Sequence, residues 1–443
     1  MCLEGRTDSG YRHLDEAIAR GARIVVVKHR CDLNDEIYQI ITDNERKTGA
    51  EIARLLHEEM LKNLKFVFIT GTKGKSTTAK ILSRLLCDVG IPTATVGTLG
   101  VEFSECLIET KNTTPDLFTI LPYLARVYQM GARMCVLEVS SQALADKRID
   151  GLRADVAIFT GLSVDHIDEN EHKSFRDYYL AKRRLFSEFG VKVGIAPLSC
   201  EYARDMLSAV QEQHFVDTKE ASDLTLKIEE MSKSGIYFTD GKHRGFLSLS
   251  GEFNLKNAAL ALLCASMITG MPPDVFYPVL SKIHVSGRLE MLRVLGRDVL
   301  IDYAHNAESV RALGSLVREL FDGSLIAVIG SVGDRARGRR RDLAVACEEA
   351  FDFTVLTEDD SENESSSDIA RELHSYFSDA ARAICVLPRE RAILHAFRRS
   401  RAGDVILLLG KGHERTIVRN GVRYKLDERE ILEKIQQEEY GKI

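Results

Sequence analysis

The sequence contains no tryptophan, and none of its nine cysteines forms a CxxC pair. Cysteines scattered in this way argue against a zinc site or a disulfide framework and indicate small buried side chains in a reducing compartment. There is no long basic run and the net charge is −6, which argues against nucleic acid as the main partner. Neither a signal peptide nor a membrane-spanning apolar run is visible, so we expect a cytoplasmic protein without membrane insertion.

The chain has 443 residues, of which 44% are hydrophobic and 28% charged, as in an ordinary globular protein of roughly three domains. Apolar runs of strand length alternate with helical patterns, which predicts an α/β protein with largely parallel sheets. A second set, from about residue 286, predicts a doubly wound, Rossmann-like sheet. The predicted strands are 23–27, 64–70, 132–140, 154–162 and 191–198, and then 297–304, 324–331, 351–358, 382–388 and 404–412.

Residues 68–80, FITGTKGKSTTAK, join a predicted strand to a predicted helix. The usual phosphate-binding loop has Gly, four free positions and then Gly-Lys-Ser/Thr, but Ile69 stands at the first glycine position and Gly71 follows two residues later. Backbone N–H groups and the helix N-terminus can hold phosphate oxygens here, Lys75 can reach the β- and γ-phosphates, and Ser76 or Thr77 can contact Mg²⁺. A glycine-rich turn with a surface lysine is the alternative, which the flanking strand and helix disfavour.

Several polar motifs follow other predicted strands. Glu138 and His166 could together bind a divalent cation, although histidine is unusual for Mg²⁺ and His166 by spacing alone reads as a polar loop residue. Lys182 by itself reads as a solvated helix lysine. In the arginine-rich stretch 330–341, the glycines after a strand favour anion binding over a solvated basic helix start.

These stretches, in this order, resemble the Mur ligase superfamily and most closely its MurE type, which adds the third amino acid to the UDP-N-acetylmuramoyl dipeptide of peptidoglycan. EVSSQAL together with GKGHE is far more specific than the shortened loop, which is the form that Mur ligases use. The matching stretches are TGTKGKSTTA, GTLG, NTTPD, LEVSSQAL, LSVDHIDE, YYLAKRRLF, GEFNLKNAALA, SGRLEML, IDYAH, GSVGDR and GKGHE.

The resemblance implies a three-domain architecture. Residues 1–62 would be a partial N-terminal, UDP-binding-like domain, residues 63–285 the central ATP-binding domain, and residues 286–443 the C-terminal Rossmann-like domain. The family's leading strand and uridine-contacting loop have no counterpart in the first segment. We therefore expect either that translation starts further upstream or that the UDP site is reduced.

The resemblance also implies the site residues, position by position. Lys75, Glu138, His166 and Lys182 would be catalytic. ATP would contact Thr72, Lys73, Gly74, Lys75, Ser76, Thr77, Asn254, Arg288, Asp302 and His305. Mg²⁺ would be held by Ser76, Glu138, His166 and Lys182, the last carbamylated by CO₂ or bicarbonate. The muramoyl dipeptide would contact Thr113, Thr114, Ser140 and Arg148, and the added amino acid would contact Arg335, Gly410 and Glu414.

The implied reaction is amide-bond formation between two small molecules, the UDP-muramoyl dipeptide and a free amino acid, by a monomeric enzyme. The substrate carboxylate attacks the γ-phosphate of ATP and forms an acyl phosphate, which the amino group of the incoming amino acid then attacks. Negative charge develops on phosphoryl and carbonyl oxygens, so Mg²⁺, Lys75 and the loop N–H groups would supply most of the stabilisation.

The sequence departs from the family pattern in three places. Gln142 stands where histidine is usual, and Asn306-Ala307 replaces Thr-Pro. Diaminopimelate-adding enzymes carry Asp-Asn-Pro-Arg where this chain has 359–362, Asp-Asp-Ser-Glu, and an acid in the arginine position repels a distal carboxylate. We expect an added residue that ends in an amine, such as L-lysine or L-ornithine, with Asp360, Glu362 or Glu364 as partner. Alternatively, the loop is merely solvated and the substrate is small or neutral.

Other functions stay open. Folylpolyglutamate synthetase is a related enzyme that lacks the UDP domain, although TTPD, EVSSQAL and GKGHE argue against it. A Mur-like ligase that acts on another acidic peptide or polymer is favoured somewhat by the incomplete first domain. A nucleotide-binding scaffold without turnover is disfavoured by the presence of Lys75, Glu138, His166 and Lys182 together.

Overall fold

The computed structural model describes residues 2, 9–163, 172–334 and 338–440. The chain divides into two compact units, each described by itself below. The first unit holds residues 1–227, 240–243 and 256–279, and the second unit holds residues 228–239, 244–255 and 280–443.

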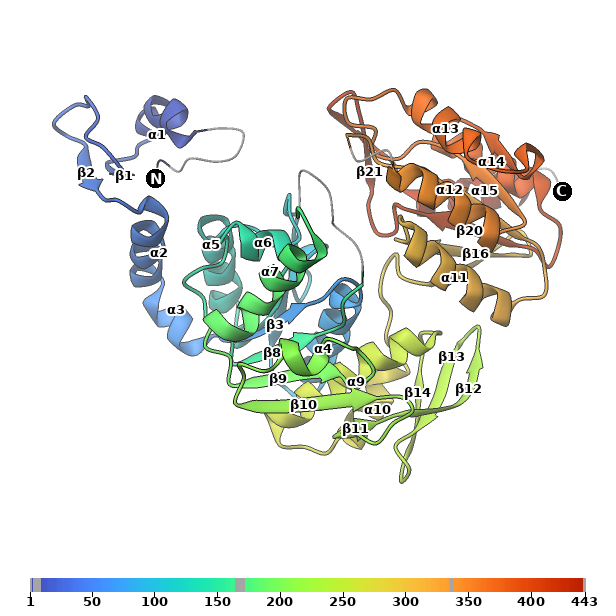
Figure 1. Ribbon diagram of the computed structural model, residues 1–443, viewed down its shortest axis with the longest axis horizontal. Helices are drawn as coiled ribbons and strands as arrows, with labels where there is room; N and C mark the ends of the chain where they lie inside the picture. Colours follow the sequence, from blue (N-terminus) through green and yellow to red (C-terminus); the bar gives the residue numbers. More distant parts are fainter. Residues whose placement is uncertain (1, 3–8, 164–171, 335–337, 441–443) are drawn as a thin grey trace. The chain divides into compact units, whose positions relative to one another are not determined.

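In Figure 1, residues 1–227 of the first unit run from blue to green and its residues 256–279 are drawn in yellow. Its elements are η1 (Gly10–His13), α1 (Leu14–Ala19), β1 (Ile24–Val27), β2 (Tyr38–Ile41), α2 (Glu45–Leu56), α3 (Glu58–Asn63), β3 (Lys65–Thr70), α4 (Lys75–Asp88), β4 (Thr93–Gly97), β5 (Gly100–Phe103), β6 (Cys106–Ile108), α5 (Leu117–Gln129), β7 (Met134–Glu138), α6 (Ser141–Ala145), β8 (Val156–Phe159), α7 (Phe175–Glu188), β9 (Val193–Pro197), α8 (Ala203–Met206), β10 (Glu212–Asp217) and β11 (Leu224–Thr225), with α9 (Glu252–Thr269), η2 (Pro273–Phe276) and α10 (Tyr277–Leu280) lying largely in it.

In the part of the chain that the structure describes, nine strands form one sheet in the order β11-β10-β9-β8-β3-β7-β4-β5-β6. All neighbours are parallel except in the β4–β5–β6 meander. The parallel sheet and the strands predicted at 64–70, 132–140, 154–162 and 191–198 are confirmed. Strand β3 lies between β7 and β8, with Ile69 opposite Glu138 and Thr70 opposite Phe159. The carboxyl ends of these three strands therefore meet at one edge.

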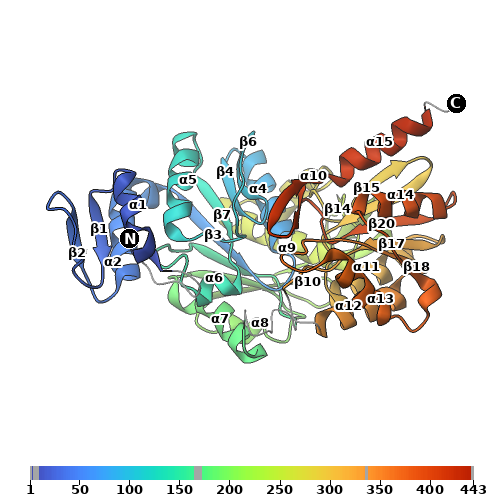
Figure 2. The same cartoon turned by 90° about the horizontal axis from the view of Figure 1, so that it is seen from above.

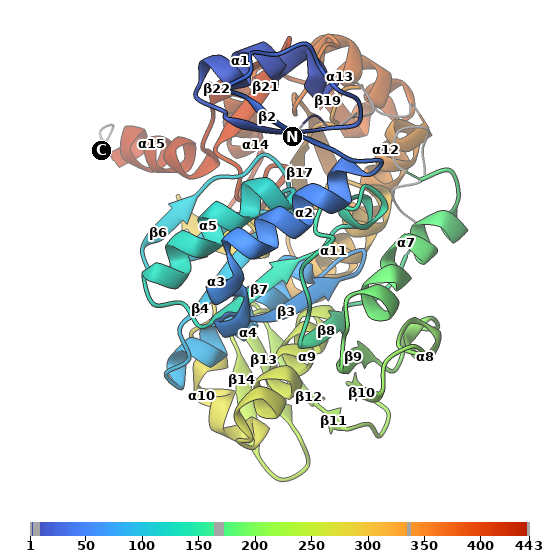
Figure 3. The same cartoon turned by 90° about the vertical axis from the view of Figure 1, so that its left-hand side faces the viewer.

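The first unit has a large core and a small one. The large core packs the apolar sides of α5 and α7 on the sheet, where Phe68, Leu137 and Phe159 are completely buried. Figure 3 shows α2 running beside α5. The small core lies under the parallel pair β1–β2, where the sequence predicted a single strand. Strand β2 escapes prediction because its four residues, YQII, are half exposed and too short to show a period.

The second unit contains a second sheet. Its elements are β12 (Lys227–Ser232), β13 (Gly235–Thr239), β14 (Arg244–Leu247), β15 (Glu290–Val294), β16 (Arg297–Asp302), α11 (Ala307–Leu320), β17 (Leu325–Ile329), α12 (Gly338–Ala350), β18 (Phe353–Leu356), α13 (Ser366–Ser375), η3 (Ala380–Arg382), β19 (Ala383–Cys385), α14 (Arg389–Arg399), β20 (Val405–Leu409), β21 (Thr416–Arg419), β22 (Val422–Lys425) and α15 (Glu428–Tyr440).

The second sheet has the order β15-β16-β20-β17-β18-β19, and only the β15–β16 pair is antiparallel among its described strands. Alternate residues of β17 enter different cores, because successive side chains of a strand point to opposite faces. Ala327 packs with α11, α12 and α13, and Val328 packs with α14 and α15. Figure 2 shows the sheet between these two helix layers. The doubly wound sheet predicted from the sequence is confirmed.

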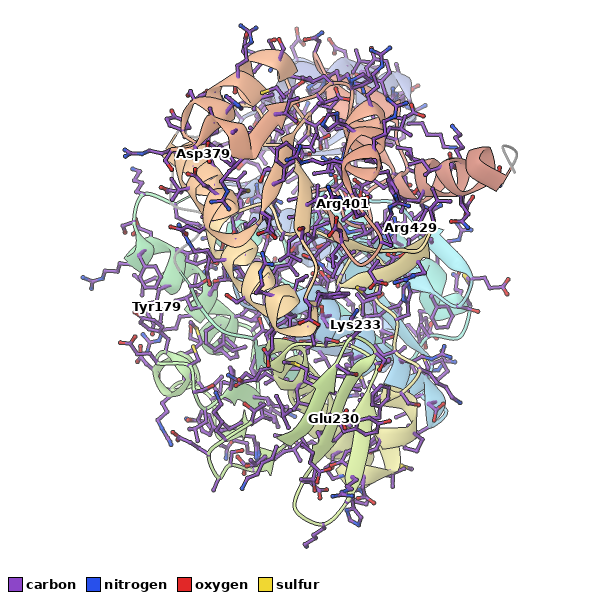
Figure 4. The ribbon with its side chains drawn as sticks, turned by 90° about the vertical axis from the view of Figure 1, so that its right-hand side faces the viewer. Tyr179, Glu230, Lys233, Asp379, Arg401 and Arg429 are labelled. Atoms are coloured by element: carbon purple, nitrogen blue, oxygen red, sulfur yellow. The ribbon has the colours of Figure 1, made fainter. Side chains whose placement is uncertain are left out.

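The start of α15 is fixed to the first strand of this sheet by Arg429, which is labelled in Figure 4. Its guanidinium donates to the Glu290 carboxylate at 3.0 Å and to Ser286 Oγ at 3.0 Å. Burial acts to lower the pKa of Arg429, but the hydrogen bond to Glu290 and the charges of Glu290, Asp427 and Glu428 together outweigh this effect and raise the pKa. The C-terminal helix is therefore part of the folded unit.

Helix α9 is a long, largely apolar helix. Its residues Leu255 and 258–265 are almost completely buried. Over the described ranges, no single helix has the length and apolar character needed to span a membrane. The bent pair Glu252–Thr269 and Pro273–Leu280, with an angle of 114° at the break, meets that criterion by length and composition.

Candidate active site

The glycine loop, residues 70–76, joins the buried strand β3 to α4. Gly74 has φ of +85° and begins the helix, and a Cβ at Gly74 would collide with the Asn257 side chain. A Cβ at Gly71 would collide with the Thr160 side chain. The loop therefore packs through bare backbone against the residue that follows β8 and against α9. Its N–H groups lie at the amino end of a long helix, a favourable place for phosphate.

Two lysines meet at one carbonyl of this loop. Lys75 Nζ donates to the carbonyl oxygens of Gly71 and Thr72, each at 3.0 Å. Lys182 Nζ, from α7, donates to the same Gly71 oxygen at 2.9 Å and lies 4.6 Å from the ring centroid of Tyr178. Lys182 is only 1% exposed. It is therefore not the solvated helix lysine that its position alone suggests.

Glu138 ends β7 and is buried at the same edge of the sheet. Its carboxylate accepts from Ser76 Oγ at 2.8 Å, from the Thr98 amide at 3.2 Å and from Thr98 Oγ1 at 3.3 Å. Gly97 has no side chain because a Cβ there would collide with this carboxylate. A hydroxyl and a carboxylate form the hard oxygen donor set that Mg²⁺ prefers. The residues present thus fit a magnesium ion that also binds phosphate oxygens.

Within the described ranges, no group of three or more His, Cys, Asp and Glu side chains is arranged to hold a metal ion. Mg²⁺ usually takes one or two carboxylates and completes its shell with water and substrate phosphates. Ser76 and Glu138 therefore suffice on the protein side. Of the two other expected ligands, Lys182 contacts the glycine loop as described above, and His166 lies outside the described residues.

The residues expected to contact the dipeptide form a network next to Glu138. Thr114 Oγ1 donates to the Glu138 carbonyl at 2.8 Å and accepts from the Ser140 amide at 2.9 Å. Thr113 Oγ1 lies 3.2 Å from Thr98 Oγ1. Arg148 reaches the Thr114 carbonyl at 3.4 Å and also pairs with Asp146 at 3.0 Å.

The remaining residues of the glycine loop are fixed by neighbours. Thr72 Oγ1 lies 2.9 Å from the Tyr178 hydroxyl and accepts from the Ser163 amide at 3.0 Å. The Lys73 carbonyl accepts from the Thr160 hydroxyl. Thr77 is buried in the first turn of α4. The first unit thus brings the expected loop residues, Glu138, Lys182 and the dipeptide residues to one edge of its sheet.

In the second unit, the expected ATP contacts gather around Tyr303. The Arg288 guanidinium lies 4.6 Å from the Tyr303 ring centroid, and the His305 ring lies 5.1 Å from it. Asp302 accepts from the amides of Leu289 and Ala304, each at 2.8 Å. Burial raises the pKa of Asp302, against the opposing effect of Arg288. Asn254, near the start of α9, donates to the Ser250 carbonyl at 2.8 Å.

Lys411 is the centre of an acidic cluster at the carboxyl end of β20. It is completely buried, and its Nζ lies 3.0 Å from Asp360 and 3.6 Å from Asp359 and also pairs with Glu414. Burial acts to lower the pKa of Lys411, but the three carboxylates outweigh it and raise the pKa. Burial, helped by the two aspartates, raises the pKa of Glu414 despite Lys411. Three carboxylates thus share a single ammonium group.

The acidic loop, residues 357–364, was expected to offer Asp360, Glu362 or Glu364 to the substrate. Asp360 accepts from Lys411 and, at 2.8 Å, from the Val418 amide. Glu364 pairs with the buried guanidinium of Arg340 at 2.6 Å. Among the residues that the structure describes, the Glu362 carboxylate alone in this trio has no ion-pair partner, and its backbone has φ of +49°. Arg335, expected near this loop, lies outside the described residues.

Sequence reasoning gave no role to Thr98, Tyr178 or Tyr303, and it did not single out Lys411. Each lies inside a stretch that carries the resemblance: GTLG, YYLAKRRLF, IDYAH or GKGHE. Their contacts join residues from different elements, which no spacing along the chain reveals. The one usable signal was their position next to a residue already assigned.

Comparisons with known proteins match almost the whole chain. The family model for the Mur ligase middle domain matches residues 69–265, and the model for the Mur ligase glutamate ligase domain matches residues 287–412. The UDP-N-acetylmuramoyl-L-alanyl-D-glutamate--2,6-diaminopimelate ligase of Aquifex aeolicus (strain VF5) is 30% identical over 438 residues, which cover 98% of this chain and 90% of that protein. The protein with the same name from Clostridium tetani (strain Massachusetts / E88) is 30% identical over 459 residues, covering 99% and 92%.

Solved structures show the same fold. A structure of a UDP-N-acetylmuramoyl-L-alanyl-D-glutamate--2,6-diaminopimelate ligase matches with a TM-score of 0.66 and 25% identity, covering 96% of this chain and 89% of that one. The MurF ligase of Thermotoga maritima in complex with ADP matches with a TM-score of 0.69 and 19% identity, covering 99% and 94%. The folylpolyglutamate synthase of Mycobacterium tuberculosis matches with 0.66 and 17%, covering 82% and 92%.

Proposed function

Because the chain belongs to the Mur ligase family, we propose that it joins an amino acid to the D-glutamyl carboxylate of UDP-N-acetylmuramoyl-L-alanyl-D-glutamate. It is an ADP-forming amide ligase that uses ATP and Mg²⁺. The carboxylate oxygen attacks the γ-phosphorus, and the bond from that phosphorus to the bridging oxygen breaks. ADP is released, and the substrate carboxylate becomes an acyl phosphate. The amine nitrogen then attacks the acyl carbon and loses a proton as phosphate leaves.

One observation carries this proposal: Lys75, Ser76, Glu138 and Lys182 meet at the carboxyl ends of β3 and β7. We expect Lys75 to exchange its two loop carbonyls for phosphate oxygens, because an ammonium group gains more from an anion than from a neutral acceptor. Mg²⁺, when bound at Ser76 and Glu138, would offset the phosphate charge. The N–H groups of 72–77 would hold the remaining oxygens.

Lys182 would act as a carbamate. CO₂ would add to the Nζ of the neutral amine, forming an N–C bond and releasing a proton. The shared Gly71 carbonyl supports this proposal, because two ammonium groups that meet there repel each other. A carbamate on Lys182 would turn that repulsion into attraction to Lys75 and would add an anionic oxygen for Mg²⁺.

We propose that Thr113, Thr114, Ser140 and Arg148 hold the dipeptide. Their network is attached to the Glu138 carbonyl, so a peptide bound there would present its carboxylate beside the proposed phosphate and metal site. Asn254, Arg288, Asp302 and His305 remain proposed contacts of ATP from the second unit. The domain limits 1–62, 63–285 and 286–443 likewise remain part of the proposal.

The added amino acid is proposed to end in an amine, as L-lysine and L-ornithine do. The cluster of Asp359, Asp360, Glu414 and Lys411 has more carboxylates than cations and so favours positively charged groups. Asp360 and Glu364 are already paired with Lys411 and Arg340, which narrows the expected partner of the side-chain amine to Glu362. Gly410 and Glu414 would hold the α-amino-acid end.

2,6-Diaminopimelate is a second candidate, because the names of the relatives state that they add it. Its distal carboxylate would have to bind where this chain offers Glu362, and like charges in a part-buried site repel. An arginine at this position would instead make a bidentate pair. The charges of this loop therefore favour an added amino acid whose side chain ends in an amine.

The experiment is phosphate release from ATP with the UDP-muramoyl dipeptide and a panel that holds L-lysine, L-ornithine, meso-diaminopimelate and small neutral amino acids. Lysine or ornithine should give the highest kcat/KM. Faster turnover with meso-diaminopimelate would overturn the amine assignment and keep the ligase. Absence of phosphate release with every amino acid would overturn the proposed acceptor, and glutamylated folate would be the next substrate to assay.

A further inference from the structure

Arg389 is the first residue of α14, and its side chain is completely buried although it is charged. Its Nε donates to the Glu428 carboxylate at 2.8 Å. One terminal nitrogen donates to the Glu358 carbonyl at 3.1 Å, and the other donates to the Leu409 carbonyl at 2.6 Å. A single guanidinium thus joins the acidic loop, the end of β20 and the start of α15.

The acidic loop reaches the loop after β20 because two glycines leave room. A Cβ at Gly330, after the end of β17, would collide with the backbone of residues 357–359. A Cβ at Gly410 would come within 2.7 Å of the Asp359 carboxylate. The acidic loop therefore crosses the end of β17 and meets the GKGHE loop, residues 410–414, although β18 and β20 are not neighbours in the sheet.

We propose that Arg389 is a positioning residue for the incoming amino acid, because it fixes the distance between the acidic loop and the GKGHE loop. The inference rests on the proposed function, which assigns Glu362 of one loop to the side-chain amine and Glu414 of the other to the α-amino-acid end. When two loops bind the two ends of one ligand, its binding geometry depends on the distance between the loops. A displacement of about 1 Å can reduce the rate about 100-fold.

The chemistry at this place requires an arginine. A guanidinium presents five N–H donors in a fixed plane, and Arg389 uses that plane to reach two carbonyls and a carboxylate. A lysine has one ammonium group and cannot occupy the three positions at once. Glu428, also completely buried, supplies the negative charge that a buried guanidinium needs.

The test compares Arg389→Lys and Glu428→Gln with the unaltered enzyme. The KM values for the amino acid, ATP and the UDP-muramoyl dipeptide are measured separately by phosphate release. Arg389→Lys should raise the KM for the amino acid about tenfold or more and should change the KM for ATP less than about twofold. Glu428→Gln should also raise the KM for the amino acid, but by less than Arg389→Lys does. The matched control is Arg391→Lys, an exposed position on the same helix, which should change none of the three.

A second measurement does not depend on turnover. Amide hydrogen exchange of residues 357–364 and 410–414 should speed up together in Arg389→Lys, while β3 and the glycine loop stay unchanged. Equal rises in the KM for ATP and for the amino acid, or exchange that rises in only one loop, would overturn the inference and leave the proposed function intact. An unaltered enzyme that turns over no amino acid would instead remove the proposed function. If Arg389→Lys fails to fold, Glu428→Gln decides by the same two readouts.

Discussion

Replacing Glu362 by arginine should exchange the substrate preference of this ligase. The carboxylate lies in a part-buried loop between Asp360 and Glu364, each of which is already paired with a buried cation. An added arginine would therefore find no unpaired acid within the trio and would remain available to the substrate. A distal carboxylate, as in meso-diaminopimelate, would then gain a charge-assisted pair, and a distal ammonium would lose one.

The size of the exchange follows from the strength of such pairs. A hydrogen bond to a charged group contributes about 1.5–3 kcal/mol, and each 1.4 kcal/mol is about tenfold in a binding constant. Losing one pair and gaining another should shift the ratio of kcat/KM for lysine over meso-diaminopimelate by roughly 10²–10⁴-fold. The substitution should neither displace the loop nor open a cavity, because Glu362 is not part of the ion pairs that hold the loop. The change in the ratio therefore comes from the lost and the gained pair alone.

The assay is steady-state phosphate release with each amino acid at saturating ATP and dipeptide. Glu433→Arg is the control, because it makes the same charge change at an exposed position of α15 in the same unit. The control should leave the ratio unchanged. A ratio that moves less than about threefold in Glu362→Arg would refute the reasoning, since one lost hydrogen bond of average strength already exceeds that. That result would favour the alternative in which the loop is merely solvated and the added amino acid is small or neutral.

Three further outcomes follow from the contacts described. Glu138→Gln keeps an oxygen that can accept the hydrogen bond from Ser76 but removes the negative charge. The half-saturating Mg²⁺ concentration should therefore rise roughly 100-fold. An unchanged Mg²⁺ titration would contradict the metal assignment. Tyr178→Phe removes the buried hydroxyl that meets Thr72, so urea unfolding should show a loss of about 1–2 kcal/mol and the KM for ATP should rise; a change in neither would exclude a structural role for that hydroxyl. Burial acts to raise the pKa of Asp240, but hydrogen bonds from the amides of His243 and Lys242 and from the Tyr277 hydroxyl lower it to about 2. Because this folded pKa lies below the unfolded value, ionised Asp240 stabilises the fold above about pH 4, and that stability is lost as the pH falls to 2. The unfolding free energy is measured with denaturant at pH 5 and at pH 2. Asp240→Asn should reduce the difference between the two values by about 2 kcal/mol.

The strands that the sequence predicts well are the buried ones. A run such as LKFVFIT is apolar on both sides because helices cover both faces of a parallel sheet, so its pattern alone identifies β3. Short and half-exposed strands such as β2, β5, β6 and β12 have no such run, and their pairing depends on neighbours far along the chain. They were therefore not predicted.

The sequence by itself determined the chemistry at the edges of the two sheets. The order of motifs placed Lys75, Glu138 and Lys182 after strands or on a following helix, and parallel strands bring such positions to one edge. Spacing along the chain determined which residue types are present there. It did not determine which charges are already paired, because pairing depends on distances between elements that only the folded chain sets.

Only the tertiary structure decided how Asp360, Glu362 and Glu364 differ. In the sequence they are alternate acids of one polar loop, and nothing local separates them. Folding brings Lys411 to the first and Arg340 to the third, from a strand end and a helix far along the chain, and it buries both cations. A buried charge requires a partner, so the fold pairs these two acids, and among the described residues the middle one has no ion-pair partner.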